Sequence, residues 1–160
     1  MVSLLRQMKR KRLSMQLNIV VRVKNTSGNE LPMYQTAGAA GCDIRSAEED
    51  VILPGEKKIF MTGLSFEIPS GFECQIRPRS SLARNHGVIV FNSPSTIDSD
   101  FRGELGILLV NTSNKNFKVD VGDRIAQLVF APVTRAAFET VTELSETIRG
   151  QSGWGSTGRQ

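Results

Sequence analysis

Short runs of alternating apolar and polar residues, separated by turn-forming residues, constrain the fold of this chain most strongly. In the first run, from Leu17 to Lys24, the residues Ile19, Val21 and Val23 fall on every second position, the period of a half-buried strand. Similar runs follow at 51–53, 57–61, 64–68, 72–76, 88–91, 105–110, 117–119 and 125–130. Many short strands separated by turn signals predict a β-sandwich, jelly roll or barrel rather than a parallel α/β sheet.

Helical signals are confined to one short segment. A helix is predicted from Ser80, whose hydroxyl can cap it, to Gly87. Residues 134–147 contain several β-branched residues and follow Pro132, so they predict a loop with some strand. The sequence therefore predicts one all-β domain with a single short helix and a tail at each end.

Composition and charge exclude several classes of protein. No apolar run approaches the roughly 18 residues that a membrane span needs, and no signal peptide is recognisable. The net charge is +4, but five cations and no acid lie in residues 1–14, which leaves −1 for the rest. We therefore expect neither a membrane nor a nucleic-acid partner. Residues 1–14 are interpreted as an unstructured extension or as an upstream start, since Met15 would also serve as a start. A short basic arm that touches nucleic acid or an anionic surface is the less favoured alternative.

The chain has two cysteines, Cys42 and Cys74, whose wide separation suggests neither a zinc site nor a disulfide framework. A reducing compartment fits this pattern, so we expect a cytoplasmic protein. The single histidine, His86, lies near the end of the predicted helix and has no second histidine or cysteine pair nearby. We interpret it as a turn residue rather than a metal ligand.

The C-terminal segment Arg149–Gly158 is too rich in glycine to build a core. Its glycines let backbone N–H groups approach an anion, and Arg149, Ser156 and Thr157 supply donors suited to phosphate oxygens. Trp154 offers a flat face for a base. From composition alone, a nucleotide clasp and a disordered, solubilising tail are both open.

Three internal segments also carry polar residues suited to anion or water chemistry. Asp98 and Asp100 flank a turn, where one carboxylate could act as a general base and either could hold a hydrated magnesium ion; an Asx-turn in a hairpin is the alternative. Pro78–Leu82 places a cation and hydroxyls at the start of the helix, which is also compatible with an ordinary capped helix. Gly122–Gln127 is a turn that enters an apolar strand and ends on a polar glutamine.

Together with one upstream segment, these sequences resemble, in order, the five motifs of the trimeric dUTP pyrophosphatases, the dUTPases. The five segments are Ala37–Arg45, Pro78–Ala83, Thr96–Gly103, Gly122–Leu128 and Arg149–Gly158. Each motif alone recurs by chance, but five in sequence order with compatible spacing are specific. The resemblance implies a single-domain jelly-roll homotrimer that hydrolyses dUTP to dUMP and pyrophosphate with Mg2+, which keeps uracil out of DNA and supplies the thymidylate precursor.

The resemblance also implies roles for individual residues. Asp98 would be the base that deprotonates the water attacking the α-phosphorus in line, and Asp43 would lie near the hydrated metal, which the triphosphate itself mainly holds. Arg79, Ser80 and Gln127 match positions that contact the triphosphate. The complete set of substrate contacts implied by the motifs is Arg79, Ser80, Ser81, Asn92, Thr96, Ile97, Phe101, Gln127, Arg149, Trp154, Gly155, Ser156 and Thr157.

The implied organisation has three parts: a basic extension at 1–14, the β domain at 15–147, and a mobile arm at 148–160 that closes over the active site. The hairpin at 92–101 would read uracil through backbone groups, with Phe101 beneath the deoxyribose. Trp154 would cover the base, and the other arm residues would hold the γ-phosphate. The family favours active sites that are shared between subunits, with the arm reaching across the trimer.

Several positions depart from the usual motifs. Phe101 replaces a tyrosine, Trp154 a phenylalanine, Ser95 and Ser152 replace glycines, and Cys42 replaces a larger side chain. Ser95 and Ser152 narrow the allowed backbone angles, so uracil fit and arm closure are where these two are expected to act. Phe101 keeps the ring face for the sugar, Trp154 should stack on uracil at least as well, and Cys42 is interpreted as a packing change.

Two alternative functions remain on the same fold: a dCTP deaminase and a non-catalytic nucleotide-binding regulator. The deaminase glutamate would fall at Leu108, where no acid is available, and the regulator is disfavoured because Asp98 and the phosphate-contacting positions are present.

Overall fold

The computed structural model describes residues 19–153, which form ten strands and one short helix. The elements are β1 (Arg22–Asn25), β2 (Cys42–Arg45), β3 (Asp50–Ile52), β4 (Lys57–Glu67), β5 (Phe72–Arg77), α2 (Ser80–His86), β6 (Val88–Val90), β7 (Ser95–Ile97), β8 (Glu104–Asn111), β9 (Phe117–Val119) and β10 (Arg124–Pro132). Within residues 19–153, no helix is long and apolar enough to cross a membrane.

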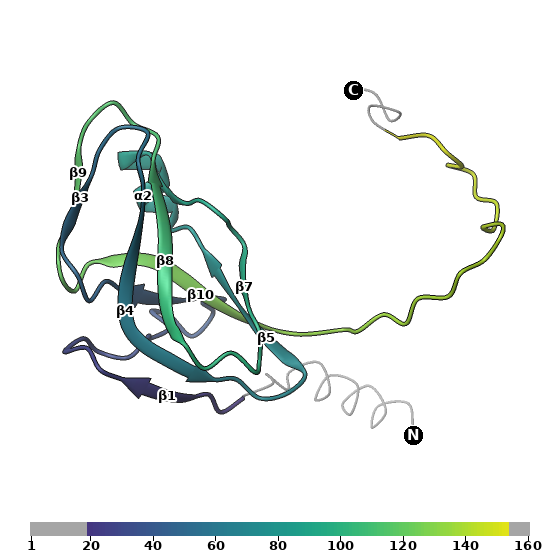
Figure 1. The fold of residues 1–160 in the computed structure, drawn as a ribbon, viewed down its shortest axis with the longest axis horizontal. Helices are drawn as coiled ribbons and strands as arrows, with labels where there is room; N and C mark the ends of the chain where they lie inside the picture. Colours follow the sequence, from purple (N-terminus) through teal and green to yellow (C-terminus); the bar gives the residue numbers. More distant parts are fainter. Residues whose placement is uncertain (1–18, 154–160) are drawn as a thin grey trace, which may run out of the picture.

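Two four-stranded antiparallel sheets form the body, with strand orders β1-β4-β8-β6 and β2-β10-β5-β7 (Figure 1). A third, two-stranded pair joins β3 to β9. Successive strands along the chain fall in different sheets, so most hydrogen-bonded neighbours are distant in sequence. The predicted all-β jelly roll with one short helix is confirmed.

The core lies between the two sheets, and in β2 and the first half of β8 its residues fall on alternate positions. In β8, Leu105, Ile107 and Leu109 are almost completely buried, and β10 contributes Ile125 and Leu128. Burying an aliphatic side chain of this size contributes about 1.5 to 3 kcal/mol, so the alternating positions drive the packing of the two sheets. The sequence shows this alternation at 105–109. In β10 the adjacent residues Ile125 and Ala126 are both buried, beside the register shift between Arg124 and Ala126 in the pairing with β2.

The two runs predicted at 57–61 and 64–68 form one continuous strand, β4. The pairing with β8 shifts register between Met61 and Ser65, and Gly63 lies within the shift at φ +69°. A Cβ at Gly63 would lie 2.5 Å from the Cβ of Ser27, so no larger residue fits without movement. The bulge breaks the period of two in the sequence but not the strand, which explains why two strands were expected.

The structure also differs from the predictions in the start of the first strand, in two additional short strands and in the cap of the helix. The first strand begins at Arg22, and the short strands β2 and β7 lie inside segments that periodicity did not mark. Helix α2 has the predicted extent and ends on Gly87 at φ 66°, but the predicted hydroxyl cap at Ser80 is wrong. Ser80 is already helical, the N-cap is Arg79, and no side-chain capping hydrogen bond forms.

Residues 133–153 run away from the body as an extended segment (Figure 1). The N–H of Val133 donates to the carbonyl of Gly71 over 2.9 Å, and every residue from 134 to 153 is exposed. The expected loop is confirmed, but the strand expected within 134–147 does not form. A strand needs a neighbour to accept its hydrogen bonds, and no strand of the body lies beside this segment.

Asn111, at the end of β8, is the largest buried polar side chain and joins three segments. Its Nδ2 donates to the carbonyls of Ile52, at 2.9 Å, and Lys115, at 2.7 Å. Its Oδ1 accepts the N–H of Ser113 at 2.9 Å. The amide therefore satisfies backbone groups of β3 and of the turn between β8 and β9, and its bond to the β3 carbonyl is buried.

Replacing Asn111 with alanine is expected to lower the free energy of unfolding by roughly 1 to 3 kcal/mol, because a buried carbonyl loses its partner. Urea unfolding at fixed protein concentration measures this. Asn114→Ala, at an exposed position of the same turn, is the matched control and should change little. Equal effects of the two substitutions would show that burial of the Asn111 amide is unimportant.

Candidate functional site

Strand β10 brings three of the sequence segments together, because it pairs with β2 on one side and β5 on the other. Gln127 lies opposite Asp43 across one pairing and opposite Arg77 across the other. Two residues after Arg77 comes Arg79, at the entrance to α2. The register of one strand therefore fixes the first, second and fourth predicted motifs at one place.

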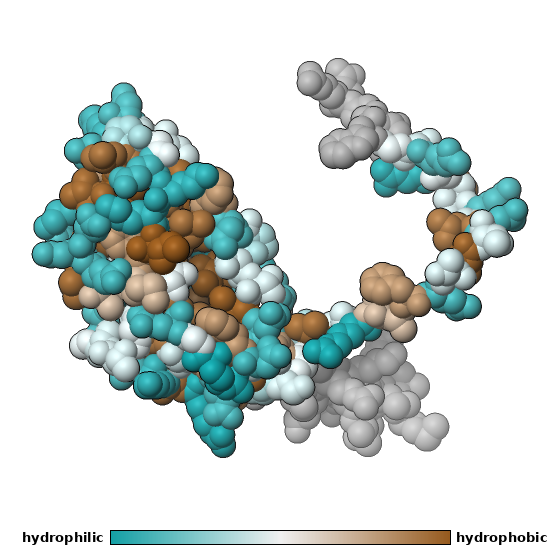
Figure 2. Space-filling model, in the orientation of Figure 1, coloured by the Kyte–Doolittle hydropathy of each residue, from teal (hydrophilic) through white to brown (hydrophobic). Residues whose placement is uncertain are grey.

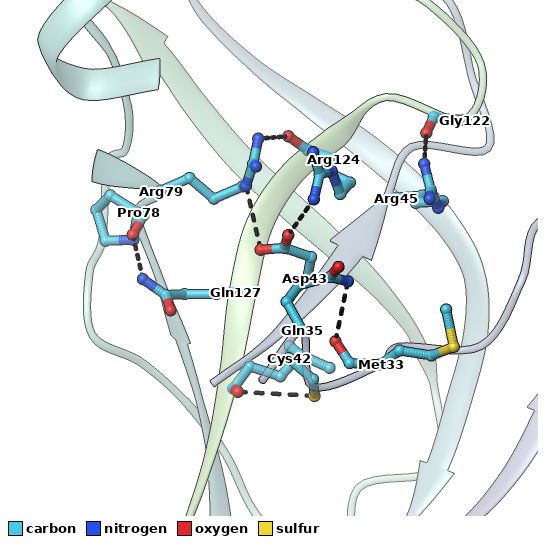
Figure 3. Close-up of polar contacts among 11 residues, drawn as sticks. Met33, Gln35, Cys42, Asp43, Arg45, Pro78, Arg79, Gly122, Arg124 and Gln127 are labelled. Atoms are coloured by element: carbon cyan, nitrogen blue, oxygen red, sulfur yellow. Dashed lines mark hydrogen bonds and ion pairs between the residues drawn. The ribbon is translucent and has the colours of Figure 1, made fainter. Parts of the chain in front are cut away.

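At this place the carboxylate of Asp43 bridges two arginines (Figure 3). Arg79 Nε donates to Oδ1 at 3.1 Å, and Arg124 Nη1 donates to Oδ2 at 3.0 Å. Arg79 Nη1 also donates to the backbone carbonyl of Arg124 at 2.9 Å. The three residues form a closed ring of hydrogen bonds, which we call the Arg79–Asp43–Arg124 ring.

Gln127 is fixed beside this ring by its neighbours. Its Nε2 donates to the carbonyl of Pro78 at 2.8 Å, at the segment that leads into Arg79 (Figure 3). A Cβ on Gly41 would lie 2.6 Å from Gln127 Oε1, so the glycine leaves room for the amide. Gly41, to which the sequence alone assigned no role, therefore leaves the space that the Gln127 amide occupies.

The cluster can hold an anion. The ring contains two guanidinium groups and one carboxylate, so it carries an excess of positive charge on side chains that are 19%, 40% and 17% exposed for Arg79, Arg124 and Asp43. The predicted contacts Ser80 and Ser81 follow Arg79 directly and are exposed. Guanidinium and hydroxyl donors in this arrangement suit phosphate oxygens.

A second group of predicted residues lies on the hairpin around β7. Thr96 and Ile97 pair with Gln75 and Cys74 of β5. Asn92 Nδ2 donates to the hydroxyl of Ser95 at 3.2 Å, so the serine that replaces the usual glycine takes part in the turn.

The acid-bearing turn after β7 is closed by local contacts. Asp98 is exposed, and its carbonyl accepts the N–H of Phe101 at 3.2 Å. The Phe101 ring lies against Gly103, where a Cβ would come within 2.5 Å of the ring. Arg102 Nη1 donates to the carbonyls of Ser99, at 2.7 Å, and of Phe101, at 2.9 Å. These bonds fix the turn that carries the carboxylate and the aromatic ring.

The two groups are far apart within one chain. Ile97 pairs with Cys74, whereas Arg77 and then Arg79 follow at the other end of β5. At about 3.3 Å per strand residue, Asp98 lies on the order of 15 to 20 Å from Arg79. In Figure 1 the turn between β7 and β8 lies near the lower edge of the body, and α2 lies near its upper edge.

The predicted arm residues belong to neither group. Arg149 lies in the extended segment, where its Nε donates to the carbonyl of Ser152 at 3.0 Å. Trp154, Gly155, Ser156 and Thr157 lie outside the described residues, as does the basic extension at 1–14.

The side chains fit a hydrated metal better than a directly bound one. Among residues 19–153, no three histidine, cysteine or acidic side chains are grouped to hold an ion. Both oxygens of Asp43 accept guanidinium N–H groups. A carboxylate has about four lone-pair positions, so Asp43 retains the capacity to accept a hydrogen bond from metal-bound water.

A jelly roll with a cationic cluster at one end of a sheet and an acid-bearing hairpin at the other has the side chains suited to a phosphate-binding β protein. The dUTPase family model matches residues 28–158, most of the chain. The chain therefore belongs to the dUTPase family.

Named relatives and solved structures agree with this assignment. The chain is 55% identical to the deoxyuridine 5'-triphosphate nucleotidohydrolase of Nautilia profundicola, covering 81% of this chain and 91% of the relative. It is 50% identical to the enzyme of the same name from Brucella melitensis, covering 87% and 91%. A Staphylococcus bacteriophage 80alpha dUTPase variant with dUpNHpp superposes with a TM-score of 0.81 at 28% identity, covering 88% and 99%.

Sequence reasoning assigned no role to Arg124 or Gly41, although both lie inside the motifs. Arg124 lies three positions before Gln127, and Gly41 two positions before Asp43. The sequence did offer a clue, because this cation and this glycine lie within three positions of residues already proposed for the site. Their contacts depend on strand pairing, which no local pattern reveals.

The two cysteines lie on β2 and β5, and both are buried thiols; Cys42 directly precedes Asp43, whereas Cys74 pairs with Ile97 of the β7 hairpin. Burial raises the pKa of Cys42 to about 11 and that of Cys74 to about 12, because the thiolate would lose its hydration. Both side chains are therefore neutral at physiological pH and act as core residues.

We expect both thiols to react with iodoacetamide at pH 8 at least about 100-fold more slowly in the native protein than an exposed cysteine. In urea both should react at once, which mass spectrometry can count. An unfolded thiol has an ordinary pKa of 9.0, whereas burial raises the pKa of both folded thiols, so the free energy of unfolding should fall as pH rises above about 9. Rapid native labelling of Cys42 or Cys74 would contradict this.

Proposed function

We propose that this chain hydrolyses dUTP to dUMP and pyrophosphate, limiting uracil in DNA and supplying dUMP for thymidylate synthesis. The family membership and the names of relatives at 50 to 55% identity support this proposal. The observation that carries it is the cationic cluster of the first, second and fourth motifs, which presents two guanidinium groups and an amide suited to a phosphate chain.

The proposed chemistry is in-line attack of water on the α-phosphorus. Asp98 accepts a proton from the attacking water as the water oxygen forms a bond to the α-phosphorus. The bond from the α-phosphorus to the oxygen that bridges to the β-phosphorus breaks, and pyrophosphate leaves. A positioned base of this kind contributes about 100- to 10,000-fold in rate. The rest of the rate enhancement comes from alignment and from charge neutralisation of the phosphate chain by Arg79, Gln127 and Ser80.

Mg2+ is the proposed cofactor, held mainly by the triphosphate and through water by Asp43. When bound, it would neutralise phosphate charge and orient the chain. The arm residues Arg149, Ser156 and Thr157 would close over the γ-phosphate, with Gly155 allowing close backbone approach.

Selection of uracil and deoxyribose is proposed to rest on the hairpin at 92–101. Backbone groups facing the uracil edge would meet a mismatched donor if cytosine entered, which costs roughly 1 to 3 kcal/mol. The exposed Phe101 ring, supported by Gly103, would lie beneath the sugar and leave no room for a 2′-hydroxyl. Trp154 would stack on the base, and Ser81, Thr96 and Ile97 would complete the contacts.

We propose that the active form is a homotrimer with shared sites. Asp98 must act at the α-phosphorus while Arg79 holds the adjoining phosphates, yet the two lie on the order of 15 to 20 Å apart in one chain. A second copy can supply the hairpin to the cationic cluster of the first, and the arm can reach across in the same way.

An apolar outer face on β4 and β8 supports this association. Ile59 is 58% exposed and pairs with Leu108, and Phe91 is 49% exposed. Figure 2 shows apolar side chains gathered over the middle of the body in this region. Exposed aliphatic and aromatic residues on adjacent strands are typical of an interface.

Partners other than dUTP and further copies of this chain are not proposed: neither a membrane nor nucleic acid is expected. A cytoplasmic location is proposed on the two unpaired, buried thiols, which suit a reducing compartment.

Strand β8 bears on the rival deaminase function, and the turn that carries Asp98 bears on the rival regulatory function. Within β8 the only acid is Glu104, and its Oε1 accepts the N–H of Gly63 at 2.7 Å, so it supports the bulge of β4. The position expected for a deaminase glutamate is Leu108. A non-catalytic regulator would have no use for the exposed Asp98 carboxylate on its fixed turn.

Purified protein with Mg2+ is expected to release pyrophosphate from dUTP but not from dCTP, dTTP or UTP, and to release no ammonia from dCTP. Asp98→Asn should lower kcat about 100- to 10,000-fold while the Kd for dUpNHpp stays within a few fold. Asp100→Asn, two positions along the same turn, is the control. Ammonia from dCTP, or no turnover by folded wild-type protein, would overturn the proposed function.

Mixed oligomers test the shared site. Asp98→Asn and Arg79→Ala proteins should each be almost inactive. Co-refolding them in equal amounts should restore about one quarter of wild-type activity. Random assortment gives half of the sites an intact hairpin and half of those an intact cluster from the neighbouring subunit. A mixture as inactive as its components would mean that each chain builds its own site. Co-refolding the Asp98→Asn protein with itself is the control.

A further inference from the structure

Of the three residues in the Arg79–Asp43–Arg124 ring, Arg124 is the one that has no individual role in the mechanism proposed above. Arg124 begins β10, and it touches both other members: its side chain donates to Asp43, and its carbonyl accepts from Arg79. Only the side chain depends on residue type, because the carbonyl is present whatever residue occupies the position.

The side-chain contact determines how Asp43 is held. Asp43 Oδ2 accepts from Arg124 at 3.0 Å, which leaves Oδ1 turned towards Arg79 Nε at 3.1 Å. Two charged hydrogen bonds on opposite oxygens fix the rotation of the carboxylate better than one can. The fixed carboxylate then orients the guanidinium of Arg79.

Charge gives the ring a second property. With Arg124 present, the Asp43 carboxylate is shared between two cations, so Arg79 keeps most of its positive charge available to an anion. Without Arg124, Asp43 would pair with Arg79 alone and offset its charge. Arg79 is 19% exposed on a partly buried surface, where such a pairing is screened less than in open solvent.

We propose that Arg124 is a positioning residue for phosphate binding, acting through Asp43 to hold Arg79 in its phosphate-binding orientation. This inference rests on the proposed dUTP hydrolysis, since Arg79 is the residue assumed to meet the phosphate chain. The proposed role of Arg124 concerns the phosphates beyond the α position, so loss of Arg124 should weaken binding of dUTP and leave binding of dUMP unchanged. A general structural role would weaken both ligands alike.

Arg45 provides a matched control. It lies on β2, opposite Arg124 in the strand pairing, and its Nη1 donates to the carbonyl of Gly122 at 2.7 Å (Figure 3). It does not contact Asp43. Arg45→Gln therefore removes an arginine from the same region without touching the ring.

Arg124→Gln is expected to raise the KM for dUTP about tenfold and to leave the inhibition constant of dUMP within about twofold. Arg45→Gln should change neither. Arg124→Lys, which keeps one cationic donor for Asp43, should restore most of the lost affinity. An equal rise for dUTP and dUMP, or an Arg124→Gln protein that behaves like Arg45→Gln, would overturn the positioning role.

A double-mutant cycle tests whether Arg124 acts through Arg79. In an Arg79→Ala background, measured by binding of dUpNHpp, the further change Arg124→Gln should alter the Kd less than about twofold. A full tenfold effect in that background would show that Arg124 acts independently. The cycle is repeated with Arg124→Met, which keeps the aliphatic stem, so that a folding defect in one variant does not decide the result.

These outcomes are distinct from failure of the proposed function. If wild-type protein does not turn over dUTP, the proposed function fails. If it does, and Arg124→Gln matches the Arg45→Gln control, only the inference about Arg124 fails.

Discussion

The pairing of β10 with two strands at once is the constraint on which the rest of the site depends. Gln127 lies opposite Asp43 on one side and opposite Arg77 on the other, so a single register aligns three segments that are distant in sequence. A slip by one residue would turn Gln127 into the core and bring a buried apolar neighbour to the surface. Core packing and site geometry are therefore fixed by the same hydrogen bonds.

Small residues make the polar arrangement possible. Gly41 leaves room for the amide of Gln127, and Gly103 leaves room for the ring of Phe101. Neither has a positive φ, so both are required by close approach rather than by backbone conformation. Gly41 and Gly103 therefore leave space for functional side chains, whereas Gly63 in β4 is needed for its positive φ.

The body holds its two functional groups rigidly and apart. The cationic cluster and the acid-bearing turn are each closed by their own hydrogen bonds, yet β5 separates them. In the proposed shared site these two groups would meet by association of subunits, which would avoid the entropy cost of ordering a long catalytic loop. Every residue of the extended segment at 133–153 is exposed, so a neighbouring subunit in the proposed trimer could contact it.

The sequence by itself determined the all-β class, most of the strands, the extent of the helix and the family, because alternation and motif order are local properties of the chain. Runs such as 105–110 report that one face is buried. It did not determine that 57–68 is one strand, that Arg79 rather than Ser80 is the N-cap, or that β2 and β7 exist. Tertiary structure alone decided that Asp43 bridges two arginines and that Asp98 lies far from them, because strand order and register arise from pairing between distant segments.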